Sequence, residues 1–251
     1  MKRVTFTNLR NLELVGYLYS GGTESIIIMC HGFASDQHSR GRFEKMANSL
    51  LGHGFSAFSF DFSGCGESAD DIIALDKLME DFNSAFAYVK ALGFKKIALY
   101  SHSLGGLISL KCFSSEISTM VLLGPHIGAK DFRGEKYNTP EQLQEIKEKG
   151  YFTFIKNNKV RQRMIVAQQL NIDLAHINPQ ELLKDVHCPI LIIHGNKGET
   201  ELEGYEMSKS AINLLSKESR LELIDGASHS FTEQYDTVVN LGTEWFLKYL
   251  A

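Results

Sequence analysis

The stretch KIALYSHSLGGLISLKCF, residues 96–113, decides the fold class. Its first part, Lys96–Tyr100, is a short apolar run that predicts a buried strand, and its last part, Leu104–Phe113, has the length and apolar character of a helix. Only the turn Ser101–Ser103 separates the two. A strand that passes into a helix through so short a turn is a repeating unit of α/β proteins. The segment therefore predicts an α/β fold.

The same alternation continues on both sides of this stretch. Apolar runs predict further strands at 26–30, 55–60, 120–123, 190–194 and 221–224, and helical patterns predict further helices at 41–51, 76–92, 205–215 and 233–250. A looser alternation near the N-terminus predicts two antiparallel strands that turn at 8–11. Continuous apolar strands between helices indicate a mostly parallel sheet, here of eight strands, with helices on both faces.

Composition and charge exclude several classes of protein. The 251 residues carry a net charge of −4, which argues against nucleic-acid binding because that requires a basic surface. No apolar run approaches the roughly 20 residues that cross a bilayer, and the N-terminus is too polar for a signal peptide, so we expect a cytoplasmic protein. The four cysteines form no CxxC pair and are expected to be buried free thiols. No cluster has metal-ligand spacing, adjacent His187 and Cys188 included, so we expect neither metal nor cofactor.

Polar, glycine-containing segments follow several predicted strands directly. The carboxyl ends of parallel strands meet at one edge of a sheet, where the active sites of such folds lie. These segments are His31–Phe33, Asp61–Ser68, Ser101–Gly106 and Asp225–Phe231. We therefore expect them to meet at one site.

This ordered set of segments resembles the α/β-hydrolase family, over nearly the whole chain and least at 126–187. The pentapeptide Ser101–Gly105 is similar to the family's G-x-S-x-G turn, with Ser101 in place of the first glycine. The resemblance implies the α/β-hydrolase fold and identifies Ser103 as the nucleophile, where the alternative is an ordinary helix N-cap. It also assigns the oxyanion hole to the backbone amides of Phe33 and Leu104.

Among nine histidines, His229 alone follows the last predicted strand in a loop that matches the family's general base. Because His102 lies inside the turn, we expect its side chain to point away from the nucleophile. His31 and the Asp61–Ser68 turn are interpreted as structural. His229 is therefore the predicted partner of Ser103.

The third member of a triad is harder to assign. In the family the acid is usually an aspartate three residues after the glycine that follows the strand 190–194, and here that position is Gly198. Glu199 is one residue later and one methylene longer, so we predict that it orients His229. Glu201, Asp131, or no acid at all remain alternatives.

Residues 126–187 interrupt the alternation at the place where the family carries a cap over the site. We therefore predict one domain, 1–251, with a small cap insertion at about 126–187. The cap contains Tyr151, Phe152 and Phe154, which could line a pocket or pack within the cap. Between Lys149 and Arg163 lie five basic residues and no acid, which could attract a carboxylate or phosphate, or form a solvated helix face.

The cap is similar to that of small-cap serine esterases, including those that act on cinnamoyl and feruloyl esters, and of monoacylglycerol lipases. The resemblance implies a serine hydrolase of small to medium carboxylic esters that acts through an acyl-enzyme, with a small-molecule ester as its partner. Two alternatives stay open: a non-catalytic, ligand-binding homologue, and a thioesterase or amidase on the same scaffold.

Overall fold

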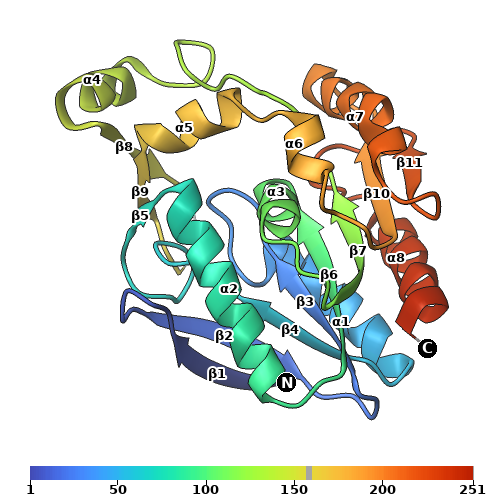
Figure 1. Ribbon diagram of the computed structural model, residues 1–251. Coiled ribbons are helices and arrows are strands. Elements are labelled where there is room, and N and C mark those ends of the chain that lie inside the picture. Colours follow the sequence, from blue (N-terminus) through green and yellow to red (C-terminus); the bar gives the residue numbers. More distant parts are fainter. Residues whose placement is uncertain (157–159, 251) are drawn as a thin grey trace.

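An eight-stranded sheet runs through the centre of the molecule (Figure 1). The computed structural model describes residues 1–156 and 160–250. The strand order is β1-β2-β4-β3-β6-β7-β10-β11; β1 pairs antiparallel with β2, β2 pairs antiparallel with β4, and all later pairs are parallel. The strands are β1 Lys2–Thr7, β2 Glu13–Tyr19, β3 Ser25–Cys30, β4 Ser56–Phe60, β6 Lys96–His102, β7 Ile117–Leu123, β10 Ile190–Gly195 and β11 Arg220–Ile224. The predicted mostly parallel sheet is confirmed.

The sheet separates two apolar cores, because side chains alternate between its faces along each strand. On β3, Ile26 and Ile28 face one core, whereas Ile27 and Met29 face the other. Helices α2 and α3 cover the first core, and α1 and α8 cover the second (Figure 1). Burial on both faces explains why β3 reads as a continuous apolar run. These helices are α1 Arg42–Gly52, α2 Leu75–Ala91, α3 Leu104–Lys111 and α8 Tyr235–Leu250, and short 3₁₀ turns lie at Ser39–Gly41 and Ile212–Leu214.

Residues 126–187, which we call the cap, contain both helices and strands. Their elements are α4 Pro140–Lys149, β8 Tyr151–Ile155, β9 Arg163–Ala167, α5 Gln168–Ala175 and α6 Pro179–Leu183. Of the described basic residues in the stretch from Lys149 to Arg163, Lys149 ends α4, Lys156 follows β8, and Arg161 and Arg163 lie just before and at the start of β9, so these four do not share one helix face. One of its members, Lys159, lies outside the described residues.

The cap is joined to the body by a second, three-stranded sheet and by an ion pair. Its middle strand, β9, pairs with β8 and also with β5, Ile72–Ile73, which belongs to the body. Next to this sheet Arg161 donates to the carbonyls of Gly66 and Ser68 and pairs with Asp70. These bonds fix one side of the cap against the loop that follows β4.

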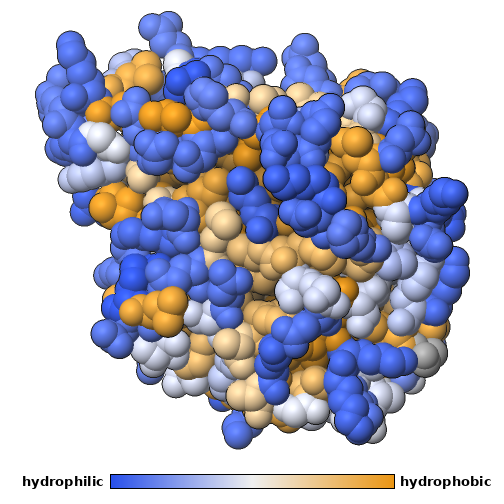
Figure 2. Space-filling model, in the orientation of Figure 1, coloured by the Kyte–Doolittle hydropathy of each residue, from blue (hydrophilic) through white to orange (hydrophobic). Residues whose placement is uncertain are grey.

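Figure 2 shows one face of the molecule. In Figure 2 hydrophilic side chains project from this face of the molecule, and hydrophobic residues lie between them. Within 1–156 and 160–250, no helix combines the length and apolar character that a membrane span requires.

Candidate active site

Ser103 lies in the turn between β6 and α3, in an unusual backbone conformation. Its φ of 55° and ψ of −119° are rare for a residue with a side chain, and the neighbouring backbone enforces them. A Cβ at Gly105 would come within 2.4 Å of the Cys30 carbonyl oxygen, so only glycine fits there. Ser101 replaces the family's first glycine without loss of a polar contact, because its hydroxyl lies 2.7 Å from the Ser109 hydroxyl. The turn therefore presents Ser103 at the N-terminus of α3.

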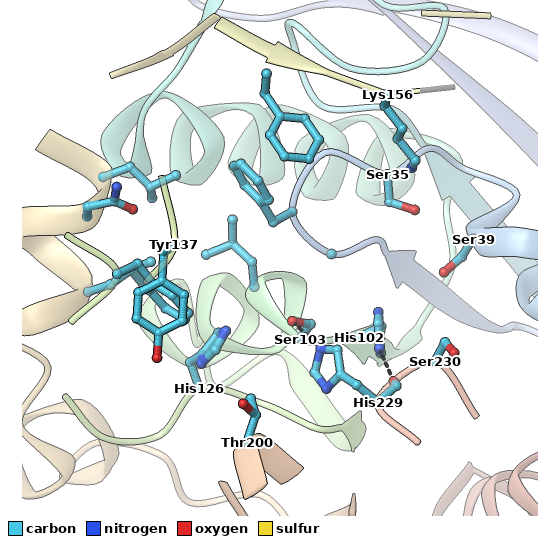
Figure 3. A pocket seen from close by; sticks show the side chains of 18 of the residues that line it. Ser35, Ser39, His102, Ser103, His126, Tyr137, Lys156, Thr200, His229 and Ser230 are labelled. Atoms are coloured by element: carbon cyan, nitrogen blue, oxygen red, sulfur yellow. Dashed lines mark hydrogen bonds between the residues drawn. The ribbon is translucent and has the colours of Figure 1, made fainter. Parts of the chain in front are cut away.

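The histidine loop brings His229 onto Ser103. Nε2 of His229 lies 2.8 Å from the Ser103 hydroxyl, and Nδ1 is hydrogen-bonded to Oε1 of Glu201. Ser103 and Glu201 are buried, whereas the His229 side chain is about two-fifths exposed. Figure 3 shows the imidazole beside Ser103 at the wall of a pocket. The hydrogen-bonded order is thus hydroxyl, imidazole, carboxylate.

The carboxylate in this chain is not the predicted one. We expected Glu199 to contact His229, but Glu199 is exposed and Glu201 makes the contact. Both residues belong to α7, Glu199–Ala211, which begins at Glu199. Residues two apart in a helix lie about 200° apart around its axis, so the two side chains face opposite ways. The other alternative, Asp131, is also exposed and pairs with Arg133.

Glu201 is held ionised by its surroundings. Burial raises the pKa of its carboxyl group, but the hydrogen bond and the charge of His229 outweigh burial, and the net pKa lies below its ordinary value. Its second oxygen lies 3.4 Å from the amide nitrogen of Gly195 and 3.9 Å from Nδ1 of His194. An ionised carboxylate behind the imidazole favours the tautomer in which Nδ1 carries the proton.

The two amides that the resemblance assigns to an oxyanion hole are both available. In the part of the chain that the structure describes, the backbone N–H groups of Phe33 and Leu104 donate to no protein acceptor. Leu104 is the first residue of α3, where helix amides have no partner within the helix. Gly32 lets its loop pass Ser103 closely, because a Cβ there would lie 3.1 Å from the Ser103 Cβ.

His102 does not point away from the site as expected. Its Nε2 donates to the carbonyl oxygen of His229 at 2.8 Å, and the two rings lie 4.8 Å apart. The next carbonyl, that of Ser230, accepts from the Arg42 guanidinium at 2.9 Å. Burial, followed by the charges of Arg42 and His229, lowers the pKa of His102 well below its ordinary value, so this imidazole is neutral. His102 and Arg42 thus hold two successive carbonyls of the histidine loop, and we call this pair of contacts the clamp. The sequence did not predict it, because the backbone conformation of the Ser103 turn sets the direction of the His102 side chain.

Residues 21–175 match the family model described as serine aminopeptidase, S33, which is also named Hydrolase_4. The chain belongs to this S33 family. The matched residues include the Ser103 turn and the loop that carries Phe33, but they end before Glu201 and His229. The match therefore covers the nucleophile's half of the site.

Solved structures share the fold of this S33 family member over nearly its whole length. Est1E from Butyrivibrio proteoclasticus, solved with ferulic acid bound, has a TM-score of 0.77 at 20% identity and covers 98% of this chain and 99% of its own. The monoacylglycerol lipase of Paleococcus ferrophilus has a TM-score of 0.74 at 18% identity, covering 94% and 99%. GrgF from Penicillium sp. sh18 has 0.78 at 16%, covering 99% and 98%. The chain has the α/β-hydrolase fold.

In this S33 family member a cavity of about 570 Å³ opens over Ser103, between the cap and the body. One side is apolar and aromatic; it is lined by Phe33, Phe132, Phe152, Phe154, Leu170 and Leu174. The rings of Phe33 and Phe154 meet edge to face at 5.3 Å, which joins the cap to the loop after β3. Phe152 also packs in the apolar core, so both uses predicted for the cap aromatics occur.

The other sequence motifs of this S33 family member have structural roles. His31 accepts from the Phe62 amide and donates to the Gly32 carbonyl at 2.8 Å, inside the loop that carries Phe33. The Asp61 carboxylate accepts from the amides of Gln37 and Glu67. Three cysteines are buried free thiols, and Cys112 is a half-buried one. Among the described side chains, no group of three or more His, Cys, Asp and Glu is arranged to hold a metal.

Proposed function

We propose that the protein is a serine hydrolase that cleaves small to medium carboxylic esters through an acyl-enzyme. The observation that carries this proposal is the continuous hydrogen-bonded chain from Ser103 through His229 to Glu201, with its serine facing the pocket. A serine hydroxyl, an imidazole and a buried carboxylate in this order form the geometry of a nucleophile, a general base and an orienting acid.

The first half of the reaction forms the acyl-enzyme. Oγ of Ser103 attacks the ester carbonyl carbon while Nε2 of His229 takes the hydroxyl proton. The negative charge that develops on the carbonyl oxygen is accepted by the amides of Phe33 and Leu104. When the tetrahedral intermediate collapses, the carbon–oxygen bond to the alcohol breaks. His229 then returns its proton to the alcohol, which leaves.

The second half repeats these steps with water. His229 takes a proton from the water as its oxygen attacks the acyl carbon, and it returns that proton to Oγ of Ser103 as the acid is released. Glu201 accepts the Nδ1 proton of His229 in a hydrogen bond throughout, so it orients the ring and stabilises the transient imidazolium.

The lining of the pocket favours an ester over the N-terminus of a peptide, although the family's description names an aminopeptidase. A free α-amino group is largely cationic at neutral pH and needs an acidic or carbonyl partner. Within the described residues, no Asp or Glu lines the pocket, whereas Arg40, Arg42 and Lys156 do. Two similar structures, one with ferulic acid bound and one of a monoacylglycerol lipase, point the same way.

Two departures from the family's sequence pattern motivated the alternative of a non-catalytic homologue, and both have a structural explanation. The missing aspartate at Gly198 is replaced by Glu201, which reaches His229 from a helix. The altered turn accommodates Ser101 through its hydrogen bond with Ser109. Neither departure therefore argues for an inactive site.

A fluorophosphonate probe and a panel of 4-nitrophenyl esters test the proposal. We expect covalent labelling at Ser103 and hydrolysis of the shorter esters, both abolished in Ser103→Ala. Ser84→Ala is the control, because Ser84 lies in α2 and does not line the pocket. Absence of labelling together with hydrolysis no faster than that of Ser103→Ala would refute the proposal.

A further inference from the structure

The side of the pocket opposite Tyr137 and His126 is rich in hydroxyl groups and cations. Figure 3 shows Ser39 and Ser230 on this side, with Ser103 and His229 lying between the two sides. We call this region the hydroxyl arm; it consists of Ser39, Arg40, Arg42, Ser228 and Ser230.

Arg42 supplies a buried positive charge without a carboxylate partner. Arg42 is 1% exposed, and among the described residues it forms no ion pair. One nitrogen donates to the Ser230 carbonyl, whereas Nε and Nη1 have no hydrogen-bond partner. Its guanidinium lies 5.7 Å from the centre of the Tyr235 ring, and burial lowers its pKa. Burying a charge without an opposite charge costs free energy. The fold nevertheless keeps the Arg42 guanidinium buried next to Ser230 without a carboxylate partner.

The rest of the pocket adds to this positive field. Arg40 is exposed at the arm and forms no ion pair in the part of the chain that the structure describes. Lys156 lines the pocket as well, and its amino group donates to the Ala34 carbonyl. The carboxylate closest to the reacting groups, Glu201, is hydrogen-bonded to His229. In a protein with a net charge of −4, the described pocket-lining residues thus include these three cations and no carboxylate, and the nearby Asp36 carboxylate accepts from the Ser39 amide.

The backbone of the hydroxyl arm is strained. Three successive residues, Ser39, Arg40 and Gly41, have positive φ values of 46°, 61° and 85°. Only the third is glycine, and residues with side chains rarely adopt this conformation. The Ser39 amide is fixed by the Asp36 carboxylate, which helps hold the turn. Such strain persists where surrounding structure enforces it and gathers at ligand sites.

We propose that the hydroxyl arm binds an anionic group, a carboxylate or a phosphate, carried by the substrate, so that the protein prefers acidic esters over neutral ones. Arg40 and Arg42 supply the positive field, and the hydroxyls of Ser39 and Ser230 supply hydrogen bonds. The other half of the ester then occupies the apolar side of the pocket. The inference rests on the proposed ester hydrolase function.

Matched pairs of esters test the preference. The first pair is 4-nitrophenyl butyrate and mono-4-nitrophenyl succinate, which differ by a carboxylate in the acyl half. The second is butyrylglycerol and butyrylglycerol phosphate, which differ by a phosphate in the alcohol half. We expect kcat/KM to be at least about tenfold higher for the anionic member of one pair, and this ratio to fall as salt is added. A higher value for the neutral member of both pairs overturns the proposal.

Variants assign the preference to the arm. Arg40→Asn removes an exposed charge and keeps a residue that tolerates positive φ, so the fold should be retained. We expect it to lower kcat/KM for the preferred anionic ester about tenfold and to change that of the neutral ester less than about threefold. Arg42→Gln should also lose the preference but should slow both esters, because Arg42 holds the Ser230 carbonyl next to His229, whereas Arg42→Lys should retain part of the preference. Arg220→Gln, at an exposed residue paired with Glu222, is the control.

The outcomes separate this inference from the proposed function. Hydrolysis that depends on Ser103 but shows no preference for anionic esters leaves the function standing and overturns the inference, as does an equal loss on both esters in Arg40→Asn. If no ester is cleaved, the proposed function fails, and calorimetry of Ser103→Ala with the first ester pair decides the inference. Tighter binding of the succinate monoester supports it, and equal or weaker binding overturns it.

Discussion

At the scale of single residues, Glu201 is the side chain that sequence spacing misplaced. The sequence analysis placed the acid by counting residues from Gly195, which assumes that the acid lies in a loop. It predicted that the next helix spans 205–215. In the structure α7 begins at Glu199, so the rotation of a helix decides which carboxylate turns inward. Ser103 and His229 were predicted from segments that follow strands directly, and the structure brings their side chains into hydrogen-bond contact.

Exchanging the two glutamates for their amides separates their roles. Glu201→Gln should lower kcat by about two to four orders of magnitude, because an amide can hold the wrong imidazole tautomer and cannot stabilise the imidazolium. Glu199→Gln, an exposed substitution on the same helix turn, should change kcat less than about twofold. Steady-state kinetics on one ester, with circular dichroism to verify folding, measure both. A larger loss in Glu199→Gln than in Glu201→Gln would contradict the assignment.

At the scale of elements, the strands and helices of the body follow from apolar periodicity, whereas those of the cap do not. β3 was predicted within one residue, and β6 was predicted from its apolar part but continues through Ser101 and His102, which the sequence had assigned to the turn. β5 has two residues and therefore no period to detect, and its pairing with β9 depends on a contact across the molecule. The clamp on the histidine loop is also long-range, since His102 and Arg42 come from β6 and α1.

Two glycine substitutions test why the turn after β6 has its sequence. In a helix, alanine is favoured over glycine by about 1 kcal/mol, so Gly52→Ala in α1, where a Cβ meets nothing within 4 Å, should be neutral or stabilising. Gly105→Ala in α3 should instead lower the free energy of unfolding by about 1–3 kcal/mol, because its Cβ meets the Cys30 carbonyl. Urea unfolding monitored by circular dichroism measures both. Equal changes in the free energy of unfolding at the two sites would show that the close contact between residue 105 and the Cys30 carbonyl does not constrain the turn.

At the scale of the whole molecule, several buried imidazoles make stability depend on acidity. Burial is the largest cause that lowers the pKa of His31, His126 and His194 to about 4, and it also lowers the pKa of His102 well below the ordinary 6.5. Each group binds its proton less readily in the folded chain than in the unfolded chain. The stability that they contribute is therefore complete above pH 6.5 and is lost as the pH falls toward 4.

We expect the free energy of unfolding to fall between pH 7 and pH 5, and the fall to become steeper toward the lower value. Each histidine changes the free energy of unfolding by at most about 1.4 kcal/mol per pH unit. Their combined effect on stability is therefore larger than that of a single surface ion pair, which contributes about 1 kcal/mol or less. Urea titrations at several pH values, with the ionic strength held constant, give this slope. A free energy that stays constant over this range would mean that the imidazoles titrate alike in the folded and unfolded chains.

The position of Glu201 in the first turn of α7 limits how the chain length can vary there. A loop absorbs an added or deleted residue by changing its path, and an acid carried by a loop can stay in place. In a helix, one residue more or less turns everything beyond it by about 100°. A residue inserted between Glu201 and the buried Ser208 would therefore turn the carboxylate away from the imidazole while the rest of α7 stays packed. The length of the chain between these two residues is restricted, although Leu202, Glu203 and Glu206 within it are exposed.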